Sequence, residues 1–254
     1  LPWDKMAVKT NHPVWGPGIR VANVPDGFKK TKAAIVKPEA IDRFTVPINR
    51  EQRDLVERKL IDAFDLTEEN IRYAEYLARQ VNELGTPTIR VPDDVLDKIL
   101  NDGRIKSQFE TQSTRGSLDP ESRALVEDKA FGFGLNIPAA NRPIYGYMDV
   151  PGVQDNAAMF GNVRIQLSDS VRDRATMTGS DSLHPLFVDA IVPAPLNNPH
   201  FTSFGRRNIM INTDLPLVTQ LNEIAGREYF EIQIHGGVNL GDIQSISFML
   251  PPDS

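Results

Sequence analysis

The stretch Arg227-Glu-Tyr-Phe-Glu-Ile-Gln-Ile-His-Gly236 decides how the second half of this chain folds. Isoleucines alternate with polar residues here, which is the period of a half-buried strand, and a pair of glycines ends it. We therefore expect Glu231 to lie on a rigid strand that follows a loop from about Asp214 to Glu228. A rigidly held carboxylate beside a mobile loop is typical of catalytic sites. The alternative is that Glu231 lies on the polar face of an ordinary strand.

The residues from 131 onward contain further short runs with strand character, separated by Gly, Pro and Asn. Several strands at this spacing are typical of a sandwich or of a pair of sheets. The expected strands are Pro143–Val150, Asn162–Leu167, Arg174–Thr178, Phe187–Val192, Arg207–Ile211, Tyr229–His235 and Ile243–Met249.

The preceding residues have helical periodicity. We predict helices from Arg50, from Thr67 as N-cap to about Leu84, over Asp93–Leu100, and from Asp119 as N-cap with Pro120 at the first position. Residues 103–118 are polar and predict a connection. The chain thus divides into an extended arm (1–49), a helical region (50–130) and a β-rich core (131–254). The predicted fold is α+β, with a helical N-terminal part followed by a mixed or antiparallel β-sandwich.

Composition excludes several classes of function. The net charge of −6 argues against a general nucleic-acid binder. The absence of cysteine removes disulfides, thiolate metal sites and cysteine nucleophiles, and the 4 histidines lack the spacing of a metal-binding helix, so we expect no metal. We expect a soluble protein, since no apolar run is long enough to span a membrane. The chain begins with Leu1, and we expect it to derive from a longer polypeptide.

Three polar elements of the β-rich half are candidates for a common site. Arg142 precedes the first strand, and arginine is well suited to gripping phosphate. Thr176, Thr178 and Ser180 alternate along a second strand and would share one face. Glu231 is the third element. Taken singly, each has a structural alternative: the arginine could pair with a surface carboxylate, and a strand rich in hydroxyls is often an exposed edge.

This order of arginine, hydroxyl and glutamate strands resembles the Arg-Ser-Glu class of ADP-ribosyltransferases. The closest likeness is to ADP-ribosyltransferase-like domains of bacteria and phages with an Arg-Pro-x-Tyr-Gly start and a Glu-x-Gln-x-His-Gly strand. Those motifs read Arg142-Pro-Ile-Tyr-Gly146 and Glu231-Ile-Gln-Ile-His-Gly236 in this sequence. The resemblance covers roughly residues 130 to 254 and implies the β-sandwich of that family.

The resemblance implies that NAD is the substrate and that ADP-ribose passes to a macromolecular acceptor, with a protein favoured over a nucleic acid. Glu231 would be the catalytic carboxylate, and the residues that bind NAD would be Arg142, Tyr145, Thr178, Ser180 and Ser182. The protein would then be the effector part of a toxin or of a phage-delivered protein, secreted or delivered into a target cell.

Two departures from the family pattern leave an alternative open. Thr178-Gly179-Ser180 stands where the family has Ser-Thr-Ser, and Tyr229 stands where many members place Gln or Glu to activate the acceptor. The alternative is a module that has lost NAD and has a structural role in a phage virion or another assembly. A glycosidase with two carboxylates is less favoured, because the sequence shows no obvious acidic partner for Glu231.

Overall fold

The computed structural model describes residues 7–12, 16–22, 48–112, 119–183, 191–204, 214–226 and 228–249. The predicted strand Arg207–Ile211 and most of the predicted strand Phe187–Val192 lie outside these residues. The same is true of most of the predicted arm, of which the structure describes two strands.

The strands form one nine-stranded sheet in the order β1-β2-β11-β6-β3-β5-β9-β7-β8, and every pair in it is antiparallel. The predicted α+β class is confirmed, and a separate two-stranded ribbon, β10-β4, accompanies the nine-stranded sheet of the described residues. The strands are β1 (Ala7–His12), β2 (Gly16–Ala22), β3 (Thr86–Val91), β4 (Arg104–Ile105), β5 (Ile144–Asp149), β6 (Val163–Leu167), β7 (Ala175–Thr178), β8 (Ala194–Pro195), β9 (Glu231–Ile234), β10 (Val238–Asn239) and β11 (Ile243–Met249).

The predicted helices are confirmed, with their caps. Thr67 accepts a hydrogen bond from the backbone of Asn70, and Asp119 accepts one from Glu121 with Pro120 at the helix start. The α-helices are α3 (Arg50–Phe64), α4 (Glu68–Leu84), α5 (Asp93–Asp102), α6 (Gln108–Thr111), α7 (Pro120–Phe131) and α8 (Leu217–Ala225). Short 3-10 helices are η2 (Ala139–Asn141), η3 (Asn156–Phe160), η4 (Asp169–Arg174), η5 (Phe201–Ser203) and η7 (Leu240–Asp242).

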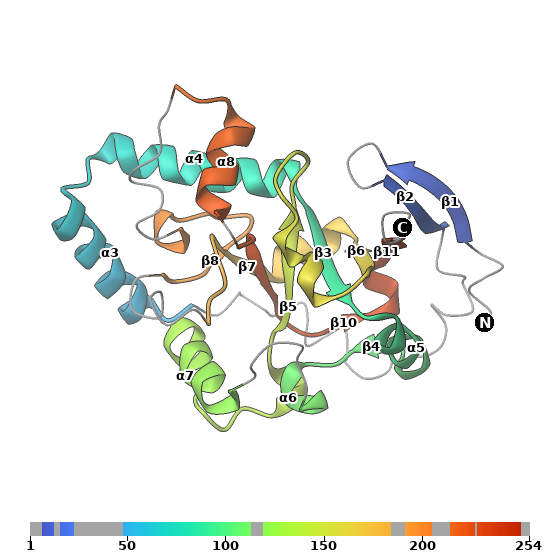
Figure 1. Ribbon diagram of the computed structural model, residues 1–254. Coiled ribbons are helices and arrows are strands. Elements are labelled where there is room, and N and C mark those ends of the chain that lie inside the picture. The colour runs from blue at the N-terminus through green and yellow to red at the C-terminus, as the bar shows by residue number, and fades with distance from the viewer. Residues whose placement is uncertain are drawn as a thin grey trace.

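The predicted connection over residues 103–118 contains β4 and α6, and two further segments differ from the prediction. The predicted loop from Asp214 to Glu228 contains the helix α8, because Leu217, Leu221 and Ile224 recur at helical spacing and turn one side of the segment toward the core. Helix α8 lies against α4 (Figure 1), and the hydroxyl of Tyr73 on α4 donates to Gln220 on α8.

The second difference is β3, which lies in the middle of the sheet between β6 and β5. Polar and apolar residues alternate from Thr86 to Val91, but Pro87 within this run is atypical of a central strand, and five of the six residues are buried. The predicted helical region and the predicted β-rich core therefore share one sheet. They also share one hydrophobic core, which includes Leu77 of α4, Ile89 of β3 and Ile232 of β9.

Within the residues described, no helix combines the length and the apolar character needed to cross a membrane.

Candidate active site

The three strands predicted to carry the site are neighbours, with β9 between β5 and β7. Glu231 on β9 lies opposite Tyr147 on β5 and opposite Thr178 on β7. Residues directly opposite one another in antiparallel strands point to the same face of the sheet. The fold thus brings the predicted hydroxyl strand and the predicted glutamate side by side.

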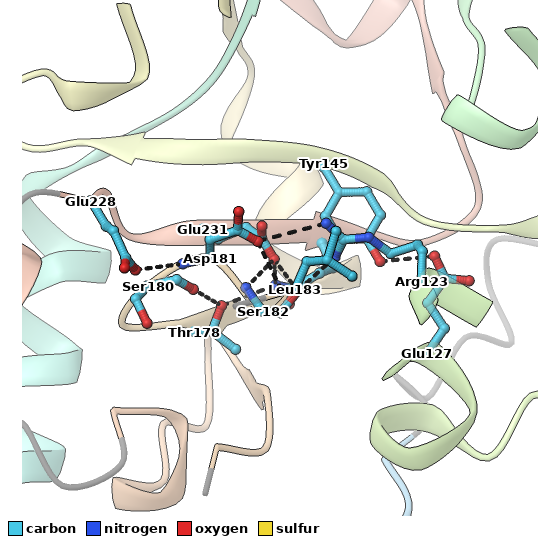
Figure 2. Close-up of polar contacts among 11 residues, drawn as sticks. Arg123, Glu127, Tyr145, Thr178, Ser180, Asp181, Ser182, Leu183, Glu228 and Glu231 are labelled. Carbon is cyan, nitrogen blue, oxygen red and sulfur yellow. Dashed lines mark hydrogen bonds and ion pairs between the residues drawn. The ribbon is translucent and has the colours of Figure 1, made fainter. Parts of the chain in front are cut away.

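Glu231 is buried and firmly held (Figure 2). Its Oε1 accepts hydrogen bonds from the Ser182 hydroxyl at 2.5 Å, from the Ser182 backbone nitrogen at 3.3 Å and from Gln233 Nε2 at 2.8 Å. Burial and, to a smaller extent, the nearby charge of Asp181 raise the pKa of Glu231 to about 7, against the lowering effect of Arg123 and of the hydrogen bonds. This carboxyl therefore changes its charge near neutral pH.

Asp181 supplies the second carboxylate of the site. Its backbone nitrogen donates to Glu228 Oε2 at 3.1 Å, and its Oδ1 accepts from the backbone of Leu183 at 2.8 Å. The same oxygen lies 3.6 Å from Arg123 Nη2, and the side chain is 35% exposed. A fixed and partly accessible carboxylate thus stands beside Glu231. The sequence did not reveal this acidic partner, since nothing in its spacing relates residue 181 to a strand 50 positions later.

Arg123 on α7 is a candidate site residue that the sequence analysis did not identify. It is 4% exposed, its Nη1 donates to the Ser182 hydroxyl at 2.9 Å, and its guanidinium carbon lies 4.3 Å from the centroid of the Tyr145 ring. Among the described residues, nothing accepts a hydrogen bond from its Nε. The only available signal was a pair of opposite charges, Arg123 and Glu127, one helical turn apart on a helix whose partners the sequence does not show.

Arg142 does not reach this cluster. It precedes β5 at the end remote from Tyr147, five residues away, which corresponds to roughly 17 Å along a strand. Its Nη1 is ion-paired with Glu127 Oε2 at 2.5 Å, its Nη2 donates to the carbonyl of Leu135 at 2.9 Å, and its guanidinium lies 3.8 Å from the Phe109 ring. This predicted phosphate-binding residue thus contacts a buried carboxylate, a backbone carbonyl and an aromatic ring.

The remaining predicted residues differ in whether they contact Glu231 directly. Ser182 contacts Glu231, as described above. Thr178 is fully buried, accepts from Gln233 Nε2 at 3.2 Å and donates to the carbonyl of Ser180 at 2.8 Å. Thr178 therefore supports the amide that holds Glu231. The hydroxyl of Ser180 is buried without a hydrogen-bond partner in the described part of the chain. Tyr145 donates to Glu127 at 2.8 Å and packs under Arg123.

A cavity of about 800 Å³ opens over this face of the sheet. Its lining includes Glu231 together with Arg90, Arg123, Tyr145, Tyr147, Phe160, Asp181 and Tyr229, and it continues to the residues of α5, β4 and α6. Burial and the charges of Glu231 and Asp181 raise the pKa of Tyr229, so its phenol is protonated at neutral pH. In the described ranges, no group of three or more His, Asp or Glu side chains is arranged to hold a metal ion.

Comparison with known proteins relates the chain to phage proteins. No protein-family model matches it. It is 33% identical over 173 residues to the "Gene 2 protein" of Mycobacterium phage D29. The aligned region covers 63% of this chain and 62% of that protein. It is 30% identical over 164 residues to the "Gene 2 protein" of Mycobacterium phage L5, with 61% of each protein covered. The similarity thus spans less than two thirds of the length of either relative.

Proposed function

We propose that this domain has the ADP-ribosyltransferase fold and transfers ADP-ribose from NAD to a macromolecular acceptor, with Glu231 as the catalytic carboxylate. The observation that carries the proposal is the position of Glu231. It lines a cavity of about 800 Å³, and its Oε1 is fixed by a serine hydroxyl and a glutamine amide. The adjacency of β5, β9 and β7 supports the resemblance that the sequence motifs suggest.

The cavity suits NAD in size and in charge. Ligand pockets usually measure about 300 to 1,000 Å³, a range that includes this one. Arg123 is a permanent cation on the cavity wall with a buried Nε that lacks a partner among the described residues. Because a buried polar group without a partner is costly, such an atom is suited to binding an anionic or hydroxylated ligand. We therefore assign to Arg123, instead of Arg142, the role of holding the ligand near Glu231.

The chemistry at Glu231 follows from its surroundings. When nicotinamide leaves NAD with the electron pair of the N-glycosidic bond, positive charge remains on the ribose. A preorganised carboxylate in a water-poor site stabilises that charge far better than water does. Ser182 and Gln233 hold one oxygen of Glu231 in place, and the second oxygen is then available for a ribose hydroxyl.

Asp181 is the residue best placed to act on the acceptor. It lines the cavity beside Glu231 and is partly exposed. Its carboxylate would take the proton of the attacking group while the new bond to the sugar forms. Tyr229 stands where relatives of the Arg-Ser-Glu class have a second acidic or amide residue, and its protonated phenol cannot serve as that base at neutral pH.

Nicotinamide release from NAD tests the proposal directly. We expect wild-type protein to release nicotinamide and Glu231→Gln to lose about a hundred- to a thousandfold of the rate, as is usual when a preorganised electrostatic group is removed. Glu223→Gln on the exposed side of α8 removes the same charge away from the cavity and is the matched control. Absence of both NAD binding and nicotinamide release in wild-type protein, with any acceptor, would favour the structural module of a virion or other assembly.

The phage relatives suit a phage-derived protein, and we propose that it acts as an effector on a protein acceptor. Mass spectrometry of a host lysate incubated with protein and NAD would detect the modified acceptor.

A further inference from the structure

The cavity has a second cationic wall, on β3, that the proposed reaction does not use. Arg90 lies there beside Tyr147. Two strand spacings, from β3 through β5 to β9, separate the strand of Arg90 from that of Glu231, which corresponds to about 10 Å. Thr88, Tyr147 and Glu231 follow one another in register across these strands, and Arg90 is two residues beyond Thr88, so it projects from the same face.

The contacts of Arg90 account for only part of its guanidinium. Its Nε donates to the hydroxyl of Tyr147 at 3.1 Å, and its Nη2 is ion-paired with Asp155. Its Nη1 is buried and has no hydrogen-bond partner among the residues that the structure describes, although the arginine side chain is only 1% exposed. A buried guanidinium nitrogen without an acceptor is rare in native proteins, and on a cavity wall it points to an anionic ligand.

The neighbouring rings make this end of the cavity selective. Tyr229 packs edge-on against Phe160, with ring centroids 5.4 Å apart, and against Tyr147, at 6.5 Å. Arg90 is thus a cation beside three aromatic rings that line the same part of the cavity. The Tyr147 hydroxyl and the Asp155 carboxylate hold its side chain in place, so little side-chain entropy would be lost when an anion binds.

We propose that Arg90 is an anion-binding residue that anchors a phosphate group of the ligand whose sugar reacts at Glu231. The inference rests on the proposed function. It assigns Glu231 to the reacting sugar and Arg90 to a phosphate group of one nucleoside diphosphate. With about 10 Å across the strands and roughly 7 Å along β3, the backbone separation of about 12 Å matches a ribose together with its attached diphosphate in order of magnitude. Arg90 belongs to none of the sequence motifs, because it lies on the strand that sequence reasoning did not find.

Calorimetric titration with ADP, and with adenosine as the probe without phosphate, tests the assignment. We expect wild-type protein to bind ADP more tightly than adenosine, and Arg90→Gln to weaken ADP binding about 10- to 100-fold with little effect on adenosine. Arg164→Gln is the matched control. Arg164 lies opposite Arg90 in the register of β3 with β6, is equally buried and is paired with Asp149 at 3.0 Å, but does not line the cavity.

Two further variants keep the test decisive. Should Arg90→Gln fail to fold by circular dichroism, Arg90→Lys keeps the charge beside Asp155 but loses the forked donors, and we expect intermediate ADP affinity. Glu231→Gln should bind ADP like wild type while it loses nicotinamide release, which separates this inference from the proposed reaction. Equal ADP affinity in wild type and in the folded Arg90 variant, or no ADP binding by wild type, would overturn the assignment.

Discussion

Replacing Glu231 by Gln should stabilise the folded protein at alkaline pH while it removes activity. The side chain is 2% exposed, and burial is the largest cause of its raised pKa. Glutamine keeps the oxygen that accepts from Ser182 and Gln233, and it removes the charge that burial penalises. The variant therefore separates the cost of the charge from the value of its hydrogen bonds.

The size of this effect on the free energy of unfolding follows from the pKa of Glu231. The ordinary carboxyl value of 4.5 rises to about 7 in the folded protein, so the folded state binds this proton more tightly than the unfolded state does. The free energy of unfolding consequently falls as pH rises from about 4.5 through about 7 and then levels off. Since a factor of ten in proton affinity corresponds to about 1.4 kcal/mol, the full loss is about 3 kcal/mol.

Urea unfolding at about pH 5 and about pH 9 measures this loss, as far as unfolding is two-state. Wild-type protein should lose most of the about 3 kcal/mol between these pH values relative to Glu231→Gln. The exposed Glu223→Gln variant should follow wild type. Parallel changes in wild type and Glu231→Gln would refute the reasoning, because the buried carboxyl would then carry no penalty for ionising.

Three further perturbations test other parts of the structure. Asp181→Asn removes a negative charge that raises the pKa of Glu231, so the pH dependence of nicotinamide release should shift to lower pH, as a pH–rate profile would show. Arg142→Ala leaves its buried carboxylate partner unpaired and should cost about 3–5 kcal/mol in urea unfolding, while the folded fraction keeps its nicotinamide release; loss of release from well-folded protein would restore Arg142 to the site. Gly146→Ala would place a methyl carbon 2.5 Å from the carbonyl oxygen of Thr88, and thermal unfolding should show a loss of about 1–3 kcal/mol; unchanged stability would mean that β3 and β5 separate easily.

Local patterns predicted the elements better than they predicted the site. The alternation around Ile232 and the N-cap at Thr67 are signals carried by a few neighbouring residues, and both elements lie where they were predicted, although β9 is buried throughout and not half-buried. The strand β3 was not predicted, although its residues alternate, because it contains Pro87 and proline is atypical of a central strand. The sequence predicts a loop where α8 lies, because a short apolar run does not by itself distinguish a helix from other structure.

The site depends on which ends of the elements meet, and the sequence does not contain that information locally. Motif order correctly placed Glu231 beside the strand of Thr178. It did not reveal that Arg142 precedes the far end of β5, nor that the register of β5 with β9 pairs Glu231 with Tyr147 instead. Arg123 comes from a helix whose orientation is set by tertiary packing alone.

The position of β9 has a consequence for the order in which the sheet assembles during folding. In the sheet of the described residues β9 links β5 to β7, yet it follows both of these strands in the chain. Until β9 inserts, β5 and β7 are not hydrogen-bonded into one sheet, and Glu231 does not line a cavity. Domains made of such long-range pairings complete late. A chain truncated before β9 would thus lack the assembled cavity.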